Sequence, residues 1–290
     1  METDHKSHEI GQNKQAVAGL FGRAASTYDR VGPRFFCHFG RRLVEVARIP
    51  KGARVLDIAT GTGAVLLPAI DVVGPQGYVT GIDLSEEMVQ KASEEIGHLT
   101  LGNAQVLQMD AEDLQFPNES FDCVLCGFSV FFFPQRDRAF SEMYRVLKPH
   151  GRMAITTWGK PVVEHVNWFT GLVAAYLCTK GRTKPAQKSH PSRQSVLDSP
   201  EELKSVMTKA VFADVQISSE TAEFVYADDE EWWSSLWSHG MRVGLEEVEK
   251  ATGKTGLEEF KTAVFNELGT MRRKDGIHQV FEALFASAIK

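Results

Sequence analysis

Ala53-Arg-Val-Leu-Asp-Ile-Ala-Thr-Gly-Thr-Gly-Ala-Val65 is the stretch that decides the fold of this 290-residue chain. Its run Val55–Ile58 is mostly apolar, as in a strand that is buried on both faces of a parallel sheet. Gly61 and Gly63 then lack the Cβ atoms that would keep a ligand away from the backbone. From Ala64 the apolar spacing suits a helix whose free N–H groups point back at the loop. The stretch therefore predicts a strand, a ligand-binding loop and a helix in succession.

Two ligand classes use such a loop, and two residues distinguish between them. A dinucleotide-binding fingerprint has a third glycine in the pattern G-x-G-x-x-G, whereas Leu66 stands in that place here. Asp57, at the carboxyl end of the strand, would also direct its carboxylate toward a pyrophosphate that is already negative. This repulsion disfavours NAD. It favours a ligand with a cationic head, such as the amino group and sulfonium of S-adenosylmethionine (SAM).

Residues 55–63, Val-Leu-Asp-Ile-Ala-Thr-Gly-Thr-Gly, resemble motif I of the class I SAM-dependent methyltransferases. That family usually has glycine where this chain has Ala59. The segment Phe21–Phe36 contains Ala-Ser-Thr-Tyr-Asp and resembles the N-terminal cap of the ubiquinone/menaquinone-biosynthesis methyltransferases and their natural-product relatives. The resemblance implies that Tyr28 faces the cofactor or the substrate. The alternative is a tyrosine that fixes a helix-to-loop junction.

The resemblance continues through acidic residues that follow the next two predicted strands. Gly77–Leu84 is predicted to be a strand that ends in Asp83, twenty residues beyond Gly63, where a carboxylate can accept both ribose hydroxyls of an adenosine. Asp110 directly follows the strand predicted at 104–109, where the family has an acid that meets the adenine amino group. These residues imply an adenosine site at the common edge to which parallel strands bring their carboxyl ends.

By resemblance, the residues that contact the cofactor lie in the cap and at these strand ends. They are Tyr28, Asp57, Ala59, Thr60, Gly61, Gly63, Asp83, Leu84, Met88, Asp110, Ala111, Glu112, Gly127, Phe128 and Ser129. Gly127, Phe128 and Ser129 fall where the transferable methyl group and the acceptor meet. Plain helix core is the alternative for Met88, and Phe131–Phe133 are expected to pack in the core.

The order of the predicted elements indicates the fold class. Strand and helix patterns alternate up to Trp158, and right-handed crossovers then imply a doubly wound α/β sheet with its ligand-bearing loops on one edge. Leu147–Gly151, Leu-Lys-Pro-His-Gly, is typical of a helix end in the family. The resemblance implies a mostly parallel, seven-stranded sheet of the Rossmann-like methyltransferase fold. Gln279–Ile289 has the periodicity of a helix, but the resemblance favours an antiparallel last strand between the fifth and sixth strands.

The chain is expected to form one α/β domain with additions. Its predicted parts are a disordered N-terminus at 1–14, a helical cap at 15–50, a SAM-binding core at 51–160, a variable helix with a basic loop at 161–198, and at 199–290 the C-terminal part of the sheet with a helical lid insertion at about 228–276. The insertion contains an aromatic helix at Glu230–Arg242 and is expected to close over the crevice.

Methyl transfer from a sulfonium needs no acid, so the reaction has no mandatory catalytic signature. A general base helps where the acceptor is a hydroxyl or an acidic carbon, and it typically contributes about 10²–10⁴-fold. His239 and His165 are the catalytic candidates in the predicted substrate-binding parts, with Arg242 near His239 to hold an anionic group. The alternative for His239 is a packed histidine with one hydrogen bond.

Net charge and the distribution of apolar residues indicate which partners and which cellular compartment are to be expected. A net charge of −6 disfavours nucleic acid, because an acidic surface repels phosphate backbones. The N-terminus has no apolar signal core and the run Val124–Phe133 is too short to cross a bilayer, so a cytoplasmic protein without stable membrane insertion is expected. The basic stretch from Lys180 to Arg193 is either a solvated loop or a means of attracting an anionic acceptor. A homo-oligomer is compatible with the sequence.

The cysteines are expected to be thiols without a metal. Cys123 and Cys126 form a C-x-x-C, but residues three apart on a strand point to opposite faces and cannot converge on one ion. Buried thiols in a reducing compartment are therefore expected.

Three functions are compatible with these residues. The first is methyl transfer to an oxygen or carbon of an apolar small molecule, of the aromatic, polyketide, terpenoid or quinone-like kind, and the tryptophans and phenylalanines in and near the predicted lid favour it. The second is a SAM-binding protein of the same fold that catalyses another reaction, such as a cyclisation, or acts as a non-catalytic module. The third is an NAD-linked oxidoreductase.

Overall fold

A twisted β-sheet forms the centre of the molecule. The computed structural model describes residues 2–99, 101–181 and 197–290, and within them the sheet has eight strands. They are β1 (Arg54–Ile58), β2 (Tyr78–Asp83), β3 (Ala104–Gln108), β4 (Phe121–Gly127), β5 (Leu147–Trp158), β6 (Ala213–Tyr226), β7 (Arg272–Arg273) and β8 (Gly276–Ile289).

The strand order confirms the predicted doubly wound, mostly parallel sheet. It runs β3-β2-β1-β4-β5-β8-β6, with the two-residue β7 paired to β8. β1 pairs in parallel with β2 and β4, β2 with β3, and β4 with β5. β8 is antiparallel to both β5 and β6 and lies between them, which confirms the antiparallel last strand expected at Gln279–Ile289.

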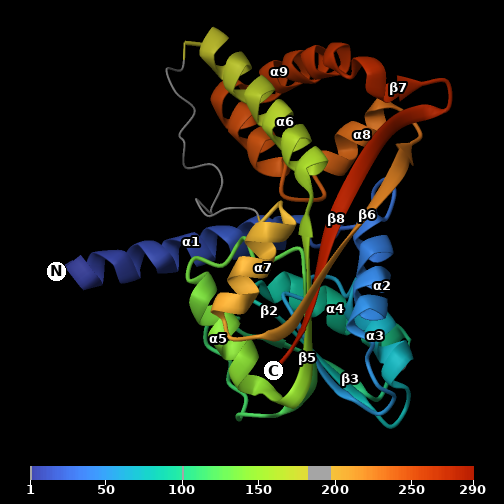
Figure 1. The fold of residues 1–290 in the computed structure, drawn as a ribbon. Helices are drawn as coiled ribbons and strands as arrows, with labels where there is room; N and C mark the ends of the chain where they lie inside the picture. The colour runs from blue at the N-terminus through green and yellow to red at the C-terminus, as the bar shows by residue number, and fades with distance from the viewer. Residues whose placement is uncertain (1, 100, 182–196) are drawn as a thin grey trace.

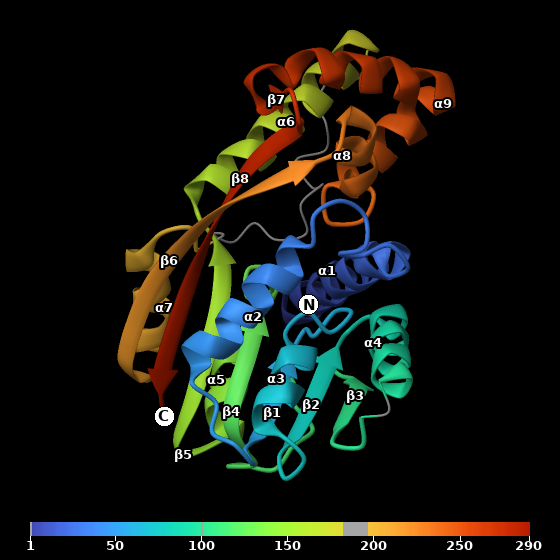
Figure 2. The ribbon, with the colours of Figure 1, turned by 90° about the vertical axis from the view of Figure 1, so that its right-hand side faces the viewer.

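Helices cover both faces of this sheet and form a layer beyond its end. They are α1 (Glu2–Ala24), α2 (Phe35–Ala47), α3 (Leu66–Val73), α4 (Glu86–His98), α5 (Arg136–Val146), α6 (Lys160–Thr179), α7 (Pro200–Lys209), α8 (Asp229–Leu236), α9 (Arg242–Glu267) and the short 3-10 helix η1 (Gly269–Met271). α2 and α3 lie on one face of the sheet, whereas α5 and α7 lie on the other (Figure 1). α6, α8 and α9 form a helical layer beyond the carboxyl ends of the parallel strands, and β6 and β8 extend into it (Figure 2).

The helical layer has a hydrophobic core of its own. Phe169, Tyr226, Trp232 and Phe260 are buried there, apart from the larger core that surrounds the sheet. Burial of such rings is the main source of stability for this layer, since each removes a large apolar area from water. Within the part of the chain that is described, no helix combines the length and apolarity needed to span a membrane.

Two segments differ from the sequence prediction at their boundaries. Disorder was predicted over 1–14, whereas the structure describes this segment from Glu2 onward as the first part of α1. The predicted helix end at Leu147–Gly151 opens β5 instead, since Leu147 has extended backbone and pairs with Phe121. Pro149 favours this outcome, because proline disfavours a helical conformation at the residue before it.

The elements near the C-terminus differ in length from what their sequence patterns suggest. Two alternating stretches at 214–218 and 222–226 belong to one strand, β6, which pairs along most of β8. α8 covers only the first part of the aromatic helix predicted at Glu230–Arg242. α9 follows within the predicted insertion and is interrupted at Gly253, whose φ of 70° is not helical.

Asp29 joins the cap segment to the first helix of the core. Its carboxylate accepts the backbone N–H groups of Phe36 at 3.3 Å and Cys37 at 3.0 Å, which are free donors in the first turn of α2. Tyr28, the residue before it, stacks on the Phe36 ring with centroids 4.9 Å apart. The Tyr-Asp pair therefore fixes the chain at the junction between the cap and α2.

Asp29→Ala is expected to lower the free energy of unfolding by about 1–2 kcal/mol, because the first turn of α2 loses its capping acceptor. Urea unfolding followed by far-UV circular dichroism measures the change. Asp71→Ala, at an exposed position of α3, is the matched control and is expected to change stability by less than about 0.5 kcal/mol. Equal stability of the Asp29 variant and the wild type would contradict the capping role.

Candidate cofactor-binding site

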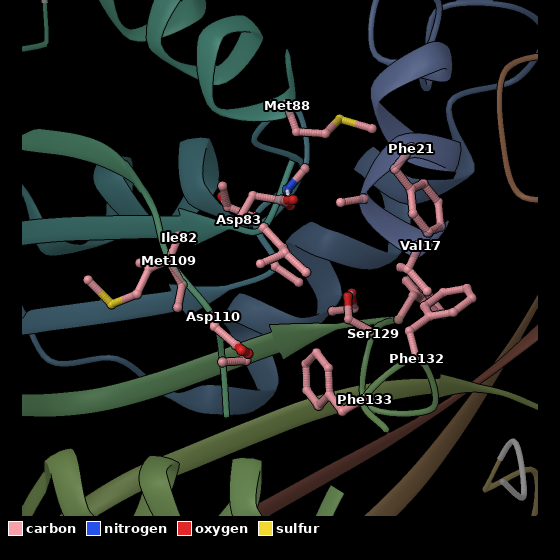
Figure 3. Close-up of a pocket in the computed structure, with 18 of the residues that line it drawn as sticks. Val17, Phe21, Ile82, Asp83, Met88, Met109, Asp110, Ser129, Phe132 and Phe133 are labelled. Atoms are coloured by element: carbon pink, nitrogen blue, oxygen red, sulfur yellow. Dashed lines mark hydrogen bonds between the residues drawn. The ribbon is translucent and has the colours of Figure 1, made fainter. Parts of the chain in front are cut away.

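A cavity lies at the carboxyl ends of β1, β2 and β4, and α1 forms one of its walls (Figure 3). The parallel sheet brings distant residues together here, because its loops leave from one edge. All of the predicted cofactor contacts except Asp57 and Gly63 line the cavity: Tyr28, Ala59, Thr60, Gly61, Asp83, Leu84, Met88, Asp110, Ala111, Glu112, Gly127, Phe128 and Ser129.

The wall formed by α1 is absent from the sequence prediction. Lys14, Val17, Ala18 and Phe21 line the cavity from one face of this helix, at helical spacing. Val17 and Phe21 reach into the cavity from α1 (Figure 3). Because disorder was expected up to residue 14, the sequence analysis did not assign this helix to the site. The helical spacing of Val17 and Phe21 could have indicated an apolar helix face there.

The loop after β4 also adds residues that the sequence analysis assigned elsewhere. Phe131 is buried in the core as expected, and Phe132 and Phe133 pack against the core but also line the cavity. The remaining lining residues come from α2 and from the segments that flank the predicted contacts: Phe36, Ala64, Val65, Ile82, Met109 and Pro134.

Positive φ angles shape the loop between β1 and α3. Ala59, Gly61 and Gly63 have φ angles of 54°, 55° and 98°. Glycine adopts such angles without strain, whereas the Cβ of Ala59 is crowded by the backbone. A Cβ on Gly61 would lie 3.8 Å from Tyr28 Cε1, which lines the same cavity. The loop therefore presents bare backbone to a ligand.

Asp83 connects this loop to β2. Its Oδ2 accepts the Gly61 N–H and its Oδ1 accepts the Ser85 N–H, both at 2.9 Å. Burial raises the pKa of Asp83, and the hydrogen bonds from backbone N–H groups oppose that rise. Each carboxylate oxygen retains a further lone pair, so Asp83 can also accept the two hydroxyl groups of a ribose.

Asp57 lies behind the loop and not in the cavity wall. It is fully buried, and its Oδ2 accepts a hydrogen bond from the Thr60 hydroxyl at 2.6 Å. In the described part of the chain its Oδ1 has no hydrogen-bond partner. Burial raises the pKa of Asp57 to about 7, although the bond from Thr60 opposes the rise. This position corrects the expectation that the carboxylate points at the ligand, because Thr60 lines the cavity in its place.

Lys14 joins two acids at the end of the cavity where the sequence predicts adenine. Its ammonium lies 2.6 Å from Asp110 Oδ2 and also pairs with Glu112 Oε2. Glu112 is buried and accepts the backbone and side-chain N–H groups of Gln135 at 2.6 and 3.1 Å. Burial lowers the pKa of Lys14, but the hydrogen bonds to both acids outweigh it and the pKa is raised. One ammonium thus pairs with two carboxylates and offsets part of their negative charge.

The structure does not bring the two catalytic candidates to the cavity. His165 and His239 are absent from its described lining, and burial lowers the pKa of each to about 4. His239 packs against Phe35 with ring centroids 6.0 Å apart, and His165 packs near Trp168 and Trp232. Both rings are therefore neutral groups packed among aromatic side chains, which corrects their assignment as bases.

The predicted anion contacts are engaged elsewhere. Arg242 donates hydrogen bonds to two backbone carbonyls and to Glu246. Lys180 pairs with Glu259 of α9 at 2.7 Å. The rest of the basic stretch, at 182–193, lies outside the described residues.

The cavity at the open edge of a Rossmann-like sheet has the carboxylates and the bare backbone that suit a nucleoside with a cationic substituent. Comparison with known proteins identifies the class of protein. The family described as "Methyltransferase domain" matches residues 55–151. Aklanonic acid methyltransferase DauC from Streptomyces sp. (strain C5) is 42% identical over 144 residues, or 50% of this chain and 66% of that protein. The match therefore spans slightly less than two thirds of that relative.

A second relative matches over more of its length. The ubiquinone/menaquinone biosynthesis C-methyltransferase UbiE from Yersinia enterocolitica is 31% identical over 224 residues, or 74% of this chain and 89% of that protein. The crystal structure of the YcgJ protein from Bacillus subtilis has the same fold, with a TM-score of 0.58 and 22% identity over 87% of this chain and 98% of that one. The chain belongs to the class I SAM-dependent methyltransferase family, and its cofactor is SAM.

The residues around the cavity fit this cofactor. The bare backbone at Gly61 leaves room for a ligand, and Asp83 retains acceptor capacity for ribose hydroxyls. The unpaired Oδ1 of buried Asp57 lies just behind the lining residue Thr60. Buried carboxylates favour a cationic ligand, because the low dielectric strengthens their attraction for the amino and sulfonium groups.

Asp57→Asn is expected to change stability in a pH-dependent way when no cofactor is bound. The folded pKa of about 7 exceeds the ordinary value of 3.8, so between these pH values the native state keeps a proton that the unfolded state has lost. The wild type therefore loses stability from this group as the pH rises toward 7, whereas the Asn variant does not. Urea unfolding of both proteins at about pH 5 and pH 8 measures the difference, which grows in favour of Asn at the higher pH. A difference that is independent of pH would contradict the raised pKa.

Asp83→Ala is expected to weaken binding of the product S-adenosylhomocysteine (SAH) by about 10–100-fold, because hydrogen bonds to a charged group contribute about 1.5–3 kcal/mol. Isothermal titration calorimetry measures the affinity. Asp113→Ala removes a nearby acid that does not line the cavity and is the matched control, expected to bind like the wild type. SAH affinity that survives the loss of Asp83 would argue against this cavity as the cofactor site.

Proposed function

We propose that this methyltransferase transfers the methyl group of SAM to an oxygen or carbon of an apolar, ring-containing small molecule. The observation that supports the proposal best is the composition of the cavity lining. We distinguish its polar residues, called the polar part, from its aromatic rings, called the aromatic part. Gly61, Asp83, Asp110 and Glu112 belong to the polar part, which suits the cofactor. The aromatic part adjoins the loop after β4 and consists of Phe21, Tyr28, Phe36, Phe128, Phe132 and Phe133.

The rings of Phe21, Tyr28, Phe36, Phe128 and Phe132 form a connected wall, in which Phe21 meets Tyr28 edge-on with centroids 6.0 Å apart. Phe21 meets Phe132 edge-on with centroids 5.1 Å apart, and Tyr28 stacks on Phe36 at 4.9 Å. Phe36 in turn meets Phe128 edge-on at 5.7 Å. Such a wall favours a flat apolar acceptor and excludes water from the reacting atoms. The names of the two relatives, one acting on aklanonic acid and one in ubiquinone/menaquinone biosynthesis, support an acceptor of this kind.

Bound SAM supplies a methyl group on a positively charged sulfur. The residues of the chain would hold and orient the two reactants. Asp83 would accept the ribose hydroxyls, Asp110 would accept the adenine amino group, and the aromatic wall would hold the acceptor near Ser129. Positioning of this kind contributes on the order of 7–11 kcal/mol in favourable cases. Exclusion of water adds to it, because the methyl group then meets no competing nucleophile.

The cavity favours an acceptor that ionises without a protein base. Its described lining includes no histidine, and the three lining carboxylates belong to the cofactor part. Burial raises the pKa of Tyr28 well above its ordinary value, and the nearby charges of Asp29 and Asp83 add to the rise. The Tyr28 hydroxyl therefore keeps its proton and donates to an acceptor oxygen. A carboxylate, phenolate or enolate is the acceptor group that such a site suits, in agreement with the predicted anionic group.

Two further sequence predictions accompany this proposal. The four cysteines, Cys37, Cys123, Cys126 and Cys178, are free thiols, which supports a reducing compartment such as the cytoplasm. Assembly of the chain into a homo-oligomer, which is compatible with the sequence, stays a prediction.

Incubation with methyl-labelled SAM is expected to label an acceptor from a panel of aromatic and polyketide carboxylic acids, phenols and quinols. Mass spectrometry of the products identifies the acceptor and the methylated atom. SAH binding without transfer to any member of the panel would instead support a SAM-binding protein that catalyses another reaction. Binding of NADH in place of SAH would contradict the proposed function.

Once the labelling experiment has identified an acceptor, Phe132→Ala tests whether that acceptor binds at the aromatic wall. The acceptor KM is expected to rise about tenfold, because an aromatic contact of about 1.5 kcal/mol is lost, while SAM affinity is retained. Phe265→Ala in α9, remote from the cavity lining, is the control that should leave both constants unchanged.

A further inference from the structure

The C-terminal end of α1 is attached to two other helices. Arg23 pairs with Glu246 of α9 at 2.7 Å, and the Arg23 carbonyl accepts a hydrogen bond from Arg242 at 2.6 Å. α1 also contacts α4, and the carboxylate of exposed Glu87 lies beside Gly22. This end of α1 is therefore fixed on both the core and the helical layer.

Lys14 attaches α1 to the core at the other end of the cavity wall. Among the described side chains of α1, the polar bond that precedes Lys14 joins His8 to Gln12 and lies within the helix itself. The N-terminal part of α1 extends beyond the sheet and its helices (Figure 1). Lys14 is thus the point at which the projecting part of α1 begins.

The partners of Lys14 are the acids at the predicted adenine end. Its Nζ lies 2.6 Å from Asp110 Oδ2 and also pairs with Glu112 Oε2. The exposed fractions of the side chains are 18% for Lys14, 30% for Asp110 and 1% for Glu112, so water screens these ion pairs only in part. Val17 and Phe21 follow on the same face of α1 and reach into the cavity (Figure 3). A ligand in the cavity therefore lies beneath α1.

We propose that Lys14 is a clasp that closes α1 over the bound cofactor and limits the rate at which SAH leaves. Asp110 accepts the adenine amino group through lone pairs that Lys14 does not use, while Glu112 keeps the ammonium in place. Each exchange of SAH for SAM then requires the contacts of Lys14 to break. Lys14 acts through the two acids and is a positioning residue. The inference rests on the proposed placement of the cofactor in this cavity.

Lys14→Met tests the clasp, because methionine retains an unbranched side chain and removes the charge. Its SAH dissociation rate is expected to be about tenfold faster than that of the wild type, with association as fast or faster. Surface plasmon resonance on the full chain measures both rates. Lys14→Arg keeps the charge and is expected to bring the dissociation rate to within about threefold of the wild type. Lys91→Met breaks the Lys91–Glu94 pair of α4, outside the cavity, and is expected to release SAH at the wild-type rate.

Hydrogen–deuterium exchange separates the clasp from a merely structural role. In the wild type, SAH is expected to slow exchange both in α1 and in the loop at 59–63. In Lys14→Met, SAH should protect the loop but no longer protect α1. Dissociation at the wild-type rate in Lys14→Met, or α1 exchange that SAH leaves unchanged in the wild type, would overturn the clasp alone. No SAH binding by the wild type would overturn the placement of the cofactor and the proposed function with it.

Discussion

The carboxylate of Asp83 makes the contacts on which the site depends. It holds the Gly61 N–H in the loop after β1 and the Ser85 N–H at the start of α4, so it joins two neighbouring crossovers at the open edge of the sheet. The parallel register of β1 and β2, which places Ile58 opposite Ile82, brings the loop within reach of this carboxylate. Burial keeps water from competing for its oxygens, which strengthens both bonds. The cofactor part of the cavity is arranged around this junction.

Buried or partly buried carboxylates lie at both ends of the cavity, and the two ends differ in where the positive charge that faces them comes from. Asp57 and Asp83 are buried carboxylates whose pKa values burial raises, and a cationic cofactor bound in the cavity would lie close to their charge. At the other end the chain supplies its own countercharge through Lys14. Because α1 is also bound to α9 through Arg23 and Glu246, the cofactor site and the helical layer share one structural element.

Residues that follow a strand directly were predicted well, and residues whose role depends on distant packing were not. Asp83 ends β2 and Asp110 follows β3, so the parallel sheet alone brings them to the cavity. Lys14 lines the same cavity only because α1 folds across the sheet edge. His239 had a sequence context that suits either a base or a packed ring, and only the position of Phe35 beside it decided between them.

The sequence by itself determined the doubly wound sheet, the glycine loop and the acids at the strand ends, because strand periodicity, turn residues and spacing are local properties of the chain. Tertiary structure alone decided which residues outside the sheet, the glycine loop and the strand ends line the cavity. It turned Asp57 away from the cavity toward Thr60, placed Phe132 and Phe133 of the loop after β4 in the cavity lining, and added one face of α1 to that lining. These outcomes depend on contacts between residues far apart in the chain, whose energies no local pattern encodes.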